Sequence, residues 1–284
     1  MPGSALSIAG WVAVLAAGGL RPQMLVSTGW LAGHLREPKV VVLHVAREKT
    51  SYDAGHIPGA RFLSYRELAI TRDGIPSELP PTADLQRLFE GLGVSDQTRM
   101  VLYGDYFGLS AARAYFSLDY LGCAGRAALL DGGLEKWRAE GRPVSTQTPQ
   151  WQPGRLKVGV RPEVVASREA VMRPAAGVVL LDVRDPADYA AGHIPGAVQV
   201  FWVDGLESKA NPVLRQPEEL RRLYEAAGLK TASKVITYCG AGVQAAQAYF
   251  TLKYLGYRVA LYDGSLSEWT RVPGAPLVKG TVPK

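Results

Sequence analysis

The chain contains two copies of one sequence unit, and this repeat constrains the fold more than any other feature. Three blocks recur in the same order, at residues 52–60 and 189–197, 101–122 and 235–256, and 131–137 and 263–269. The first pair reads YDAGHIPGA and YAAGHIPGA, with eight of nine positions identical, and the second pair matches at 11 of 22 positions. Matching blocks in a fixed order indicate a duplicated domain. Each copy has about 120 residues, an ordinary size for one domain.

The repeat sets the expected domain boundaries. We predict one domain at residues 23–145 and a second at residues 161–284. Between them, residues 146–160 contain Pro149, Pro153 and Gly154 and lack periodic apolar residues, which is typical of a linker.

Within each copy, short apolar runs alternate with helical patterns. The runs have no polar alternation, as expected for strands that are buried on both faces, and they lie at residues 39–45, 100–103, 127–130, 178–183, 234–238 and 259–262. Segments with apolar residues at helical spacing lie at residues 82–92, 111–121, 218–227 and 245–255. This alternation predicts an α/β fold with two tandem domains, each a mainly parallel sheet flanked by helices.

Composition narrows the function classes. The chain has 284 residues, 47% of them hydrophobic, and a formal net charge of +6. It contains no run of five or more Lys and Arg residues and no zinc-finger spacing, so we expect no nucleic acid partner. The positive balance suits a small anionic substrate.

The N-terminal segment is apolar. Residues 5–20 read ALSIAGWVAVLAAGGL, which is shorter than the about 20 residues that a membrane span needs. They resemble the core of a secretory signal peptide, although Met1 to Ser4 carry no Lys or Arg. We therefore interpret residues 1–22 as a signal peptide or as an N-terminal helix on the fold. A periplasmic and a cytoplasmic location both stay open, and we expect no stable membrane span.

Cys239 stands at the position where an α/β fold places its chemistry. It directly follows the predicted strand at residues 234–238, and ligands bind at the carboxyl ends of such strands. Between Cys239 and the next helix lie Gly240, Ala241, Gly242, Val243 and Gln244. A short glycine-containing loop that leads into a helix directs several backbone N–H groups at one point. Such a nest is expected to stabilise a thiolate and lower the pKa of the cysteine.

The first copy lacks this nucleophile. The alignment of the second block places Asp105 opposite Cys239, and Asp105 cannot carry sulfur. The other cysteine, Cys123, lies just past a predicted helix, so we interpret it as a structural thiol and expect no Cys123–Cys239 disulfide. The histidines of the two GHIPGA turns, His56 and His193, occur in both copies, which favours an architectural role.

Four motifs carry a resemblance to a known family. They are the GHIPGA turn, the triplet Asp182-Val183-Arg184, the loop from Cys239 to Gln244, and the pair Asp263-Gly264. From about residue 24 onward the chain resembles the tandem rhodanese sulfurtransferases, which use thiosulfate or 3-mercaptopyruvate. The resemblance implies two rhodanese domains, with the active cysteine in the second only.

The resemblance also implies a mechanism. Cys239 takes sulfur from a small anionic donor as a persulfide and passes it to a thiophilic acceptor, such as cyanide or a thiol, with no cofactor or metal. The backbone of Gly240 to Gln244 and the Arg184 side chain are the predicted substrate contacts. The neutral loop resembles that of the mercaptopyruvate enzymes. Both arginines that clamp the carboxylate in those enzymes are missing here, because the first expected position is Asp188 and the later one falls in a stretch that this chain lacks. Pairing with Asp188 is an alternative role for Arg184.

Two other function classes compete with this reading. A cysteine phosphatase needs Arg six residues after its Cys, and position 245 is Ala, which argues against that chemistry. A persulfide carrier that delivers sulfur to a partner protein would have the same sequence features as an enzyme, so this alternative stays open.

Overall fold

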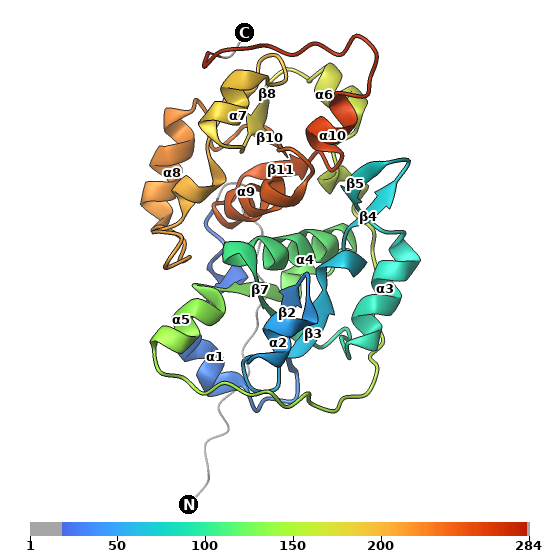
Figure 1. Ribbon diagram of the computed structural model, residues 1–284, viewed down its shortest axis with the longest axis vertical. Helices are drawn as coiled ribbons and strands as arrows, with labels where there is room; N and C mark the ends of the chain where they lie inside the picture. The colour runs from blue at the N-terminus through green and yellow to red at the C-terminus, as the bar shows by residue number, and fades with distance from the viewer. Residues whose placement is uncertain (1–18, 283–284) are drawn as a thin grey trace, which may run out of the picture.

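Two parallel sheets, stacked one above the other, form the molecule (Figure 1). The computed structural model describes residues 19–282. The first sheet has the order β1-β7-β6-β2-β3, with strands at Leu25–Val26, Ala127–Leu130, Arg99–Gly104, Val40–Ala46 and Arg61–Ser64. The second has the order β11-β10-β8-β9, with strands at Arg258–Leu261, Lys234–Tyr238, Val178–Asp182 and Val198–Gln199. The predicted α/β class with two parallel sheets is confirmed.

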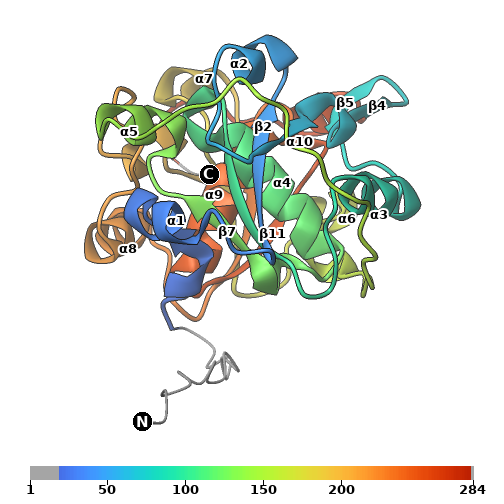
Figure 2. The same cartoon turned by 90° about the horizontal axis from the view of Figure 1, so that it is seen from below.

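Helices cover both faces of each sheet. Those of the first half are α1 (Thr28–His34), α2 (Lys49–Asp53), α3 (Thr82–Gly91), α4 (Leu109–Tyr120) and α5 (Gly133–Ala139). Those of the second half are α6 (Arg168–Met172), α7 (Pro186–Ala191), α8 (Pro217–Ala226), α9 (Val243–Tyr254) and α10 (Ser265–Trp269). Short 3-10 turns occur at η1 (Pro22–Met24), η2 (Tyr65–Glu67), η3 (Tyr106–Gly108), η4 (Ala124–Arg126), η5 (Pro162–Val164) and η6 (Trp202–Gly205). Figure 1 shows α4 between the first sheet and α9, and Figure 2 shows the first half from below.

The central strands formed where their apolar runs predicted them. Six of the seven residues of β2 are buried, and β10 and β7 have the bounds predicted from the sequence. Strands covered on both faces need side chains that are apolar throughout, which makes them easy to recognise. The edge strands β1 and β9, with two residues each, carry no such pattern and were not predicted.

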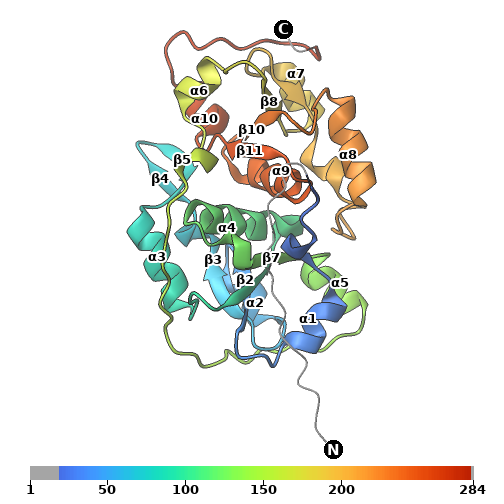
Figure 3. The same cartoon turned by 180° about the vertical axis from the view of Figure 1, so that it is seen from behind.

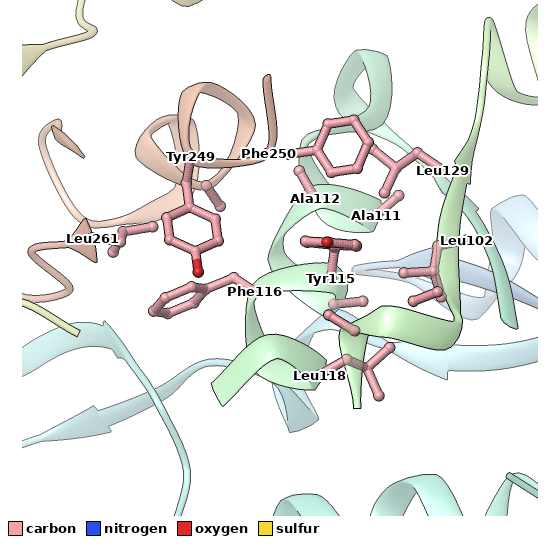
Figure 4. Packing of buried hydrophobic residues seen from close by; sticks show 14 of the residues in the cluster. Leu102, Ala111, Ala112, Tyr115, Phe116, Leu118, Leu129, Tyr249, Phe250 and Leu261 are labelled. Carbon is pink, nitrogen blue, oxygen red and sulfur yellow. The ribbon is translucent and has the colours of Figure 1, made fainter. Parts of the chain in front are cut away.

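Helices α4 and α9 join the two halves across an apolar interface (Figure 4). The rings of Tyr115 and Phe250 meet edge to face at 4.9 Å, and those of Phe116 and Tyr249 meet at 5.1 Å. In the repeat, Tyr115 corresponds to Tyr249 and Phe116 to Phe250, so the two contacts are equivalent. The interface therefore resembles that of a two-fold dimer whose subunits are fused in one chain.

Each half also reaches across to an aspartate of the other. The hairpin of β4 (Ile70–Arg72) and β5 (Ile75–Glu78) leads to Leu79, whose amide donates to the Asp263 carboxylate at 2.7 Å. In the equivalent contact, the amide of Leu214 donates to Asp131 at 3.1 Å. Figure 3 shows this hairpin beside α10.

The predicted linker, residues 146–160, forms no helix or strand. It runs along α3 toward α6 (Figure 3) and is anchored where the Trp151 indole N–H donates to the Gly91 carbonyl at 2.8 Å and where Leu156 is buried. Most of the apolar N-terminal segment lies outside the described residues. Within residues 19–282, no helix has the length and apolar character required to span a bilayer.

Candidate active site

Cys239 lies at the carboxyl end of β10, with only 2% of its surface exposed. The chain turns through Gly240 and Ala241 and enters α9 after Gly242, which caps the helix with a φ of 75°. A Cβ at Gly242 would come within 2.6 Å of the Asp263 carbonyl oxygen. Both the backbone angle and this close approach therefore require glycine at position 242.

Gly240 differs from Gly242 in its backbone conformation. Its φ lies outside the left-handed region, and a Cβ there would meet open space. The backbone conformation therefore does not require glycine at position 240. A small residue at this position keeps the mouth of the site open.

Three backbone N–H groups act on the thiol, and two of them, those of Ala241 and Gln244, belong to the loop that was predicted to form the nest. The amides of Ala241, Gln244 and Ala245 interact with the sulfur of Cys239. Burial nevertheless has the larger effect and raises the pKa of the Cys239 thiol, while the three amides act in the opposite direction. This direction is opposite to the expected fall in pKa, because desolvation of a charge on a buried sulfur outweighs the effect of the amides.

Ser265 holds the loop in place and was missed in the sequence. Its buried hydroxyl accepts hydrogen bonds from the amides of Cys239 and Gly242, both at 3.1 Å, and donates to the Tyr262 carbonyl at 2.9 Å. Ser265 has a φ of 49°, a left-handed conformation that is unfavourable for a residue with a Cβ. Its equivalent in the first half is Gly133, with a φ of 56°. The Ser265 side chain is therefore present at this position although its backbone conformation is strained.

A cleft of about 650 Å³ opens above Cys239 between the two halves. Its second-half lining includes four predicted residues of the loop, Gly240, Ala241, Val243 and Gln244, together with Arg184, Asp188 and Ser267. The first half contributes Arg47, Tyr65, Tyr106, Leu109 and Ser110. These five residues follow the carboxyl ends of strands in the first sheet, and no local pattern in the sequence linked them to Cys239.

Arg184 lies at the edge of the cleft and is mostly engaged by its own half. Its Nε and Nη2 donate to the Asp182 carboxylate, with the shortest distance 2.6 Å. Nη1 donates to the backbone carbonyl of Asp188 at 3.1 Å, and Nη2 also donates to the Gly192 carbonyl at 2.7 Å. The suggested ion pair between Arg184 and the Asp188 carboxylate is therefore wrong. Asp182 is two residues away on the end of β8, where it meets the guanidinium directly.

The residue equivalent to Cys239 in the first half is Gly104, not Asp105. Tyr238 pairs with Asp182 across the second sheet, and Tyr103 pairs with His44 across the first. Each tyrosine hydroxyl also accepts from the isoleucine amide of its GHIPGA turn. The strand registers therefore place Gly104 opposite Cys239, whereas the alignment of the helices places Asp105 there. The difference arises because the loop between strand and helix is one residue longer in the first half. A Cβ at Gly104 would meet the Val45 carbonyl oxygen at 2.2 Å.

The remaining candidates lie away from the cleft. Cys123 and Cys239 are both free thiols, as predicted, and Cys123 is buried. His56 stacks on Tyr52 with ring centroids 3.7 Å apart, and His193 stacks on Tyr189 at 3.8 Å. Both histidines are fully buried in their turns, as expected for architectural residues.

Comparisons with known proteins agree with this geometry. The family model described as the rhodanese-like domain matches twice, at residues 27–140 and 168–272. The chain is 37% identical to the sulfur carrier protein TtuD of Thermus thermophilus, over 91% of this chain and 98% of that protein. It is 31% identical to the thiosulfate sulfurtransferase of Pseudomonas aeruginosa, over 89% of this chain and 96% of that protein.

A solved structure has the same architecture. The 3-mercaptopyruvate sulfotransferase SseA of Escherichia coli superposes with a TM-score of 0.74 at 25% identity, over 85% of this chain and 98% of that one. Two matching domains, the shared fold and the curated relatives lead to one conclusion. The chain belongs to the rhodanese-like domain family, as a tandem two-domain member.

Proposed function

We propose that this protein is a sulfurtransferase that moves sulfane sulfur from thiosulfate, or from 3-mercaptopyruvate, to a thiophilic acceptor through a persulfide on Cys239. Sulfur transfer or carriage is what the names of its curated relatives describe. The observation that carries the proposal is a single thiol on the floor of an inter-domain cleft, surrounded by the amides of Ala241, Gln244 and Ala245.

The reaction proceeds by double displacement. The Cys239 thiolate attacks the outer sulfur of thiosulfate, the bond between the two sulfurs of the donor breaks, and sulfite leaves with the electron pair. The product is a persulfide anion on Cys239. Cyanide then attacks the terminal sulfur, the persulfide bond breaks, thiocyanate leaves, and the thiolate is regenerated. Charge and atoms balance in both steps without a cofactor.

The loop amides are placed to hold negative charge during both steps. Burial raises the pKa of the Cys239 thiol, while the loop amides and the Ser265 hydroxyl oppose that rise. The terminal sulfur of a persulfide extends beyond the Cys239 sulfur and reaches the more open side of the nest. Backbone N–H groups fixed in advance stabilise such an anion with little reorganisation.

Of the predicted substrate contacts, Gly242 now has a positioning role, because its amide is bonded to Ser265. We assign the electrostatic work to Ala241, Gln244 and Ala245, with Gly240 and Val243 shaping the mouth. Arg184 keeps one N–H free and lies at the rim, so we assign it a minor contact with the donor.

The test is turnover of thiosulfate and cyanide to thiocyanate. Cys239→Ser should abolish it by at least about a thousandfold, as removal of a nucleophile does in other enzymes. Cys123→Ser, which removes the other thiol, should retain wild-type turnover. Equal activity in wild type and Cys239→Ser would exclude the proposal. Parallel assays with 3-mercaptopyruvate rank the two donors by kcat/KM.

Delivery of sulfur to a partner protein is a second candidate, favoured by the 37% identity to a protein named a sulfur carrier. In that case, thiosulfate should load Cys239 in a single turnover, while cyanide or small thiols discharge it slowly. Fast steady-state turnover with a small acceptor would instead favour the enzyme.

A further inference from the structure

Two arginines line the cleft above Cys239, and they differ in how much of their guanidinium is already bonded. Arg184 donates to the Asp182 carboxylate and to two backbone carbonyls. Within residues 19–282, the Arg47 guanidinium makes no hydrogen bond or ion pair with a protein group, and its recorded contacts are with two aromatic rings. Arg47 is therefore the arginine in this cleft whose N–H donors are available for a ligand.

Arg47 is nevertheless held in position. It follows the carboxyl end of β2, and its backbone amide donates to the Asp105 carboxylate at 3.0 Å. The central carbon of its guanidinium lies 5.0 Å from the ring centre of Tyr65 and 5.6 Å from that of Tyr106. A guanidinium that contacts ring faces keeps the N–H groups in its own plane free for other acceptors.

Within the described residues, no acidic side chain forms an ion pair with the Arg47 guanidinium. Its neighbour Glu48 forms an ion pair with Arg66, and Lys49 pairs with Asp53. Among the residues that line the cleft, Asp188 contributes the single carboxylate, and the loop around Cys239 is neutral. A cation of this kind at the mouth of a cleft attracts small anions and orients them.

We propose that Arg47, supplied by the half that lacks the nucleophile, binds the anionic group of the sulfur donor. This inference rests on the proposed function, because it assigns a residue to the donor of that reaction. The two parallel N–H groups of a guanidinium match the paired oxygens of a sulfonate or a carboxylate. With those oxygens on Arg47, the outer sulfur of the donor is directed toward Cys239 on the floor of the cleft.

The sharpest test does not require sulfur transfer. Iodoacetate and iodoacetamide both alkylate a thiolate with loss of iodide, and they differ in that iodoacetate carries a negative charge. We compare their second-order rate constants at Cys239 in wild type, Arg47→Gln and Arg47→Lys, with Cys123→Ser as the common background. Arg222→Gln, which removes an exposed positive charge on α8 outside the cleft, is the matched control.

The ratio of the iodoacetate rate to the iodoacetamide rate should fall by about fivefold in Arg47→Gln, the effect of one charge at contact distance in a hydrated site. It should stay near the wild-type value in Arg47→Lys and in Arg222→Gln. An unchanged ratio in Arg47→Gln, or an equal fall in Arg47→Lys or Arg222→Gln, would overturn the assignment.

Turnover supplies a second readout. In Arg47→Gln, KM for thiosulfate should rise about tenfold while kcat changes less than twofold, as expected when a binding contact made equally in ground and transition states is removed. A fall in kcat with constant KM would also contradict the proposal. If wild type fails to turn over thiosulfate, the proposed function is wrong, while the alkylation ratio still decides whether Arg47 binds anions.

Discussion

The two halves of this molecule share one fold, and differences at a few equivalent positions are the basis for placing the proposed chemistry in one half. In the second half, a short loop connects β10 to α9 and presents Cys239. In the first half, the loop between β6 and α4 is one residue longer, begins with Gly104, and places Tyr106 and Phe107 in left-handed conformations. The first loop therefore cannot form the same nest.

This difference also bears on the role that we propose for the first half. Val45 leaves no room for a Cβ at Gly104, so a cysteine cannot be accommodated there without movement of the backbone. The longer loop instead presents Tyr106 to the shared cleft, where it contacts Arg47. On this account, one half supplies the nucleophile and the other supplies part of the wall that recognises the donor.

The largest expected effect concerns the pair of equivalent residues Asp119 and Lys253. A two-fold arrangement brings equivalent positions together, and here they carry opposite charges and form a buried ion pair. Asp119 also accepts from the Tyr249 hydroxyl at 2.6 Å and pairs with Arg161. Asp119→Asn should lower the free energy of unfolding by about 3–5 kcal/mol, because Lys253 is left buried without its counter-charge.

Urea denaturation checks this prediction, with Asp84→Asn as the control. Asp84 pairs with Arg87 on the exposed surface of α3, where the loss should stay below about 1 kcal/mol. Equal losses in the two variants would show that the buried ion pair between Asp119 and Lys253 does not stabilise the contact between the halves.

We next expect the two halves to differ in how much stability they lose in acid. His44 occupies the position of Asp182 and is buried, and burial lowers its pKa to about 4, with smaller contributions from His56 and Arg138. The unfolded chain therefore binds more protons between pH 6.5 and 4, so stability falls as the pH falls through this window. The expected loss from His44 is about 3 kcal/mol.

His44→Asn should remove that part of the acid sensitivity, measured as the difference in unfolding free energy between pH 7 and pH 4. Hydrogen exchange should locate the acid effect in β2 and β6 of the first half, before β8 and β10. Simultaneous loss of protection in both sheets would contradict this assignment.

The smallest of the predicted effects concerns Ser265 and its equivalent, Gly133. Ser265→Ala should destabilise the protein by about 1–3 kcal/mol, because the amides of Cys239 and Gly242 lose a buried acceptor. Ser265→Gly loses the same hydrogen bonds but relieves the left-handed strain, so it should be more stable than the Ala variant by about 1 kcal/mol.

Both Ser265 variants should also shift the pH profile of iodoacetamide labelling at Cys239 to higher pH, because the Ser265 hydroxyl lowers the pKa of the thiol. A variant with weakened stability but an unchanged labelling profile would indicate that Ser265 supports the fold without acting on the nucleophile.

Much of the fold could be predicted because its signals are local. The buried strands β2, β6, β8 and β10 are continuous apolar runs, and the repeat fixed the two-domain organisation. The position of Cys239 at the carboxyl end of a strand could be predicted because strand, glycine loop and helix follow one another in the chain. The hairpin of β4 and β5 was missed, since these strands of three and four residues carry no continuous apolar run.

The remainder of the site depends on tertiary contacts that leave no local pattern. Arg47 is nearly two hundred residues from Cys239 in sequence, and the two line the same cleft only because the halves pack against each other. The match of Asp105 to Cys239 failed for a related reason, because a one-residue insertion in a loop can be located only when the strand register is known. The pKa of Cys239 likewise depends on burial, which the loop sequence does not reveal.

The central claim is that sulfur is carried by Cys239 of the second half and by no other thiol. The most direct measurement is mass spectrometry of the intact protein and its peptides after a single exposure to thiosulfate without an acceptor. The account predicts the added mass of one sulfur atom on the peptide that contains Cys239, its removal by cyanide, and no addition on the peptide that contains Cys123. Sulfur on Cys123, or none on Cys239 in a folded protein, would contradict it.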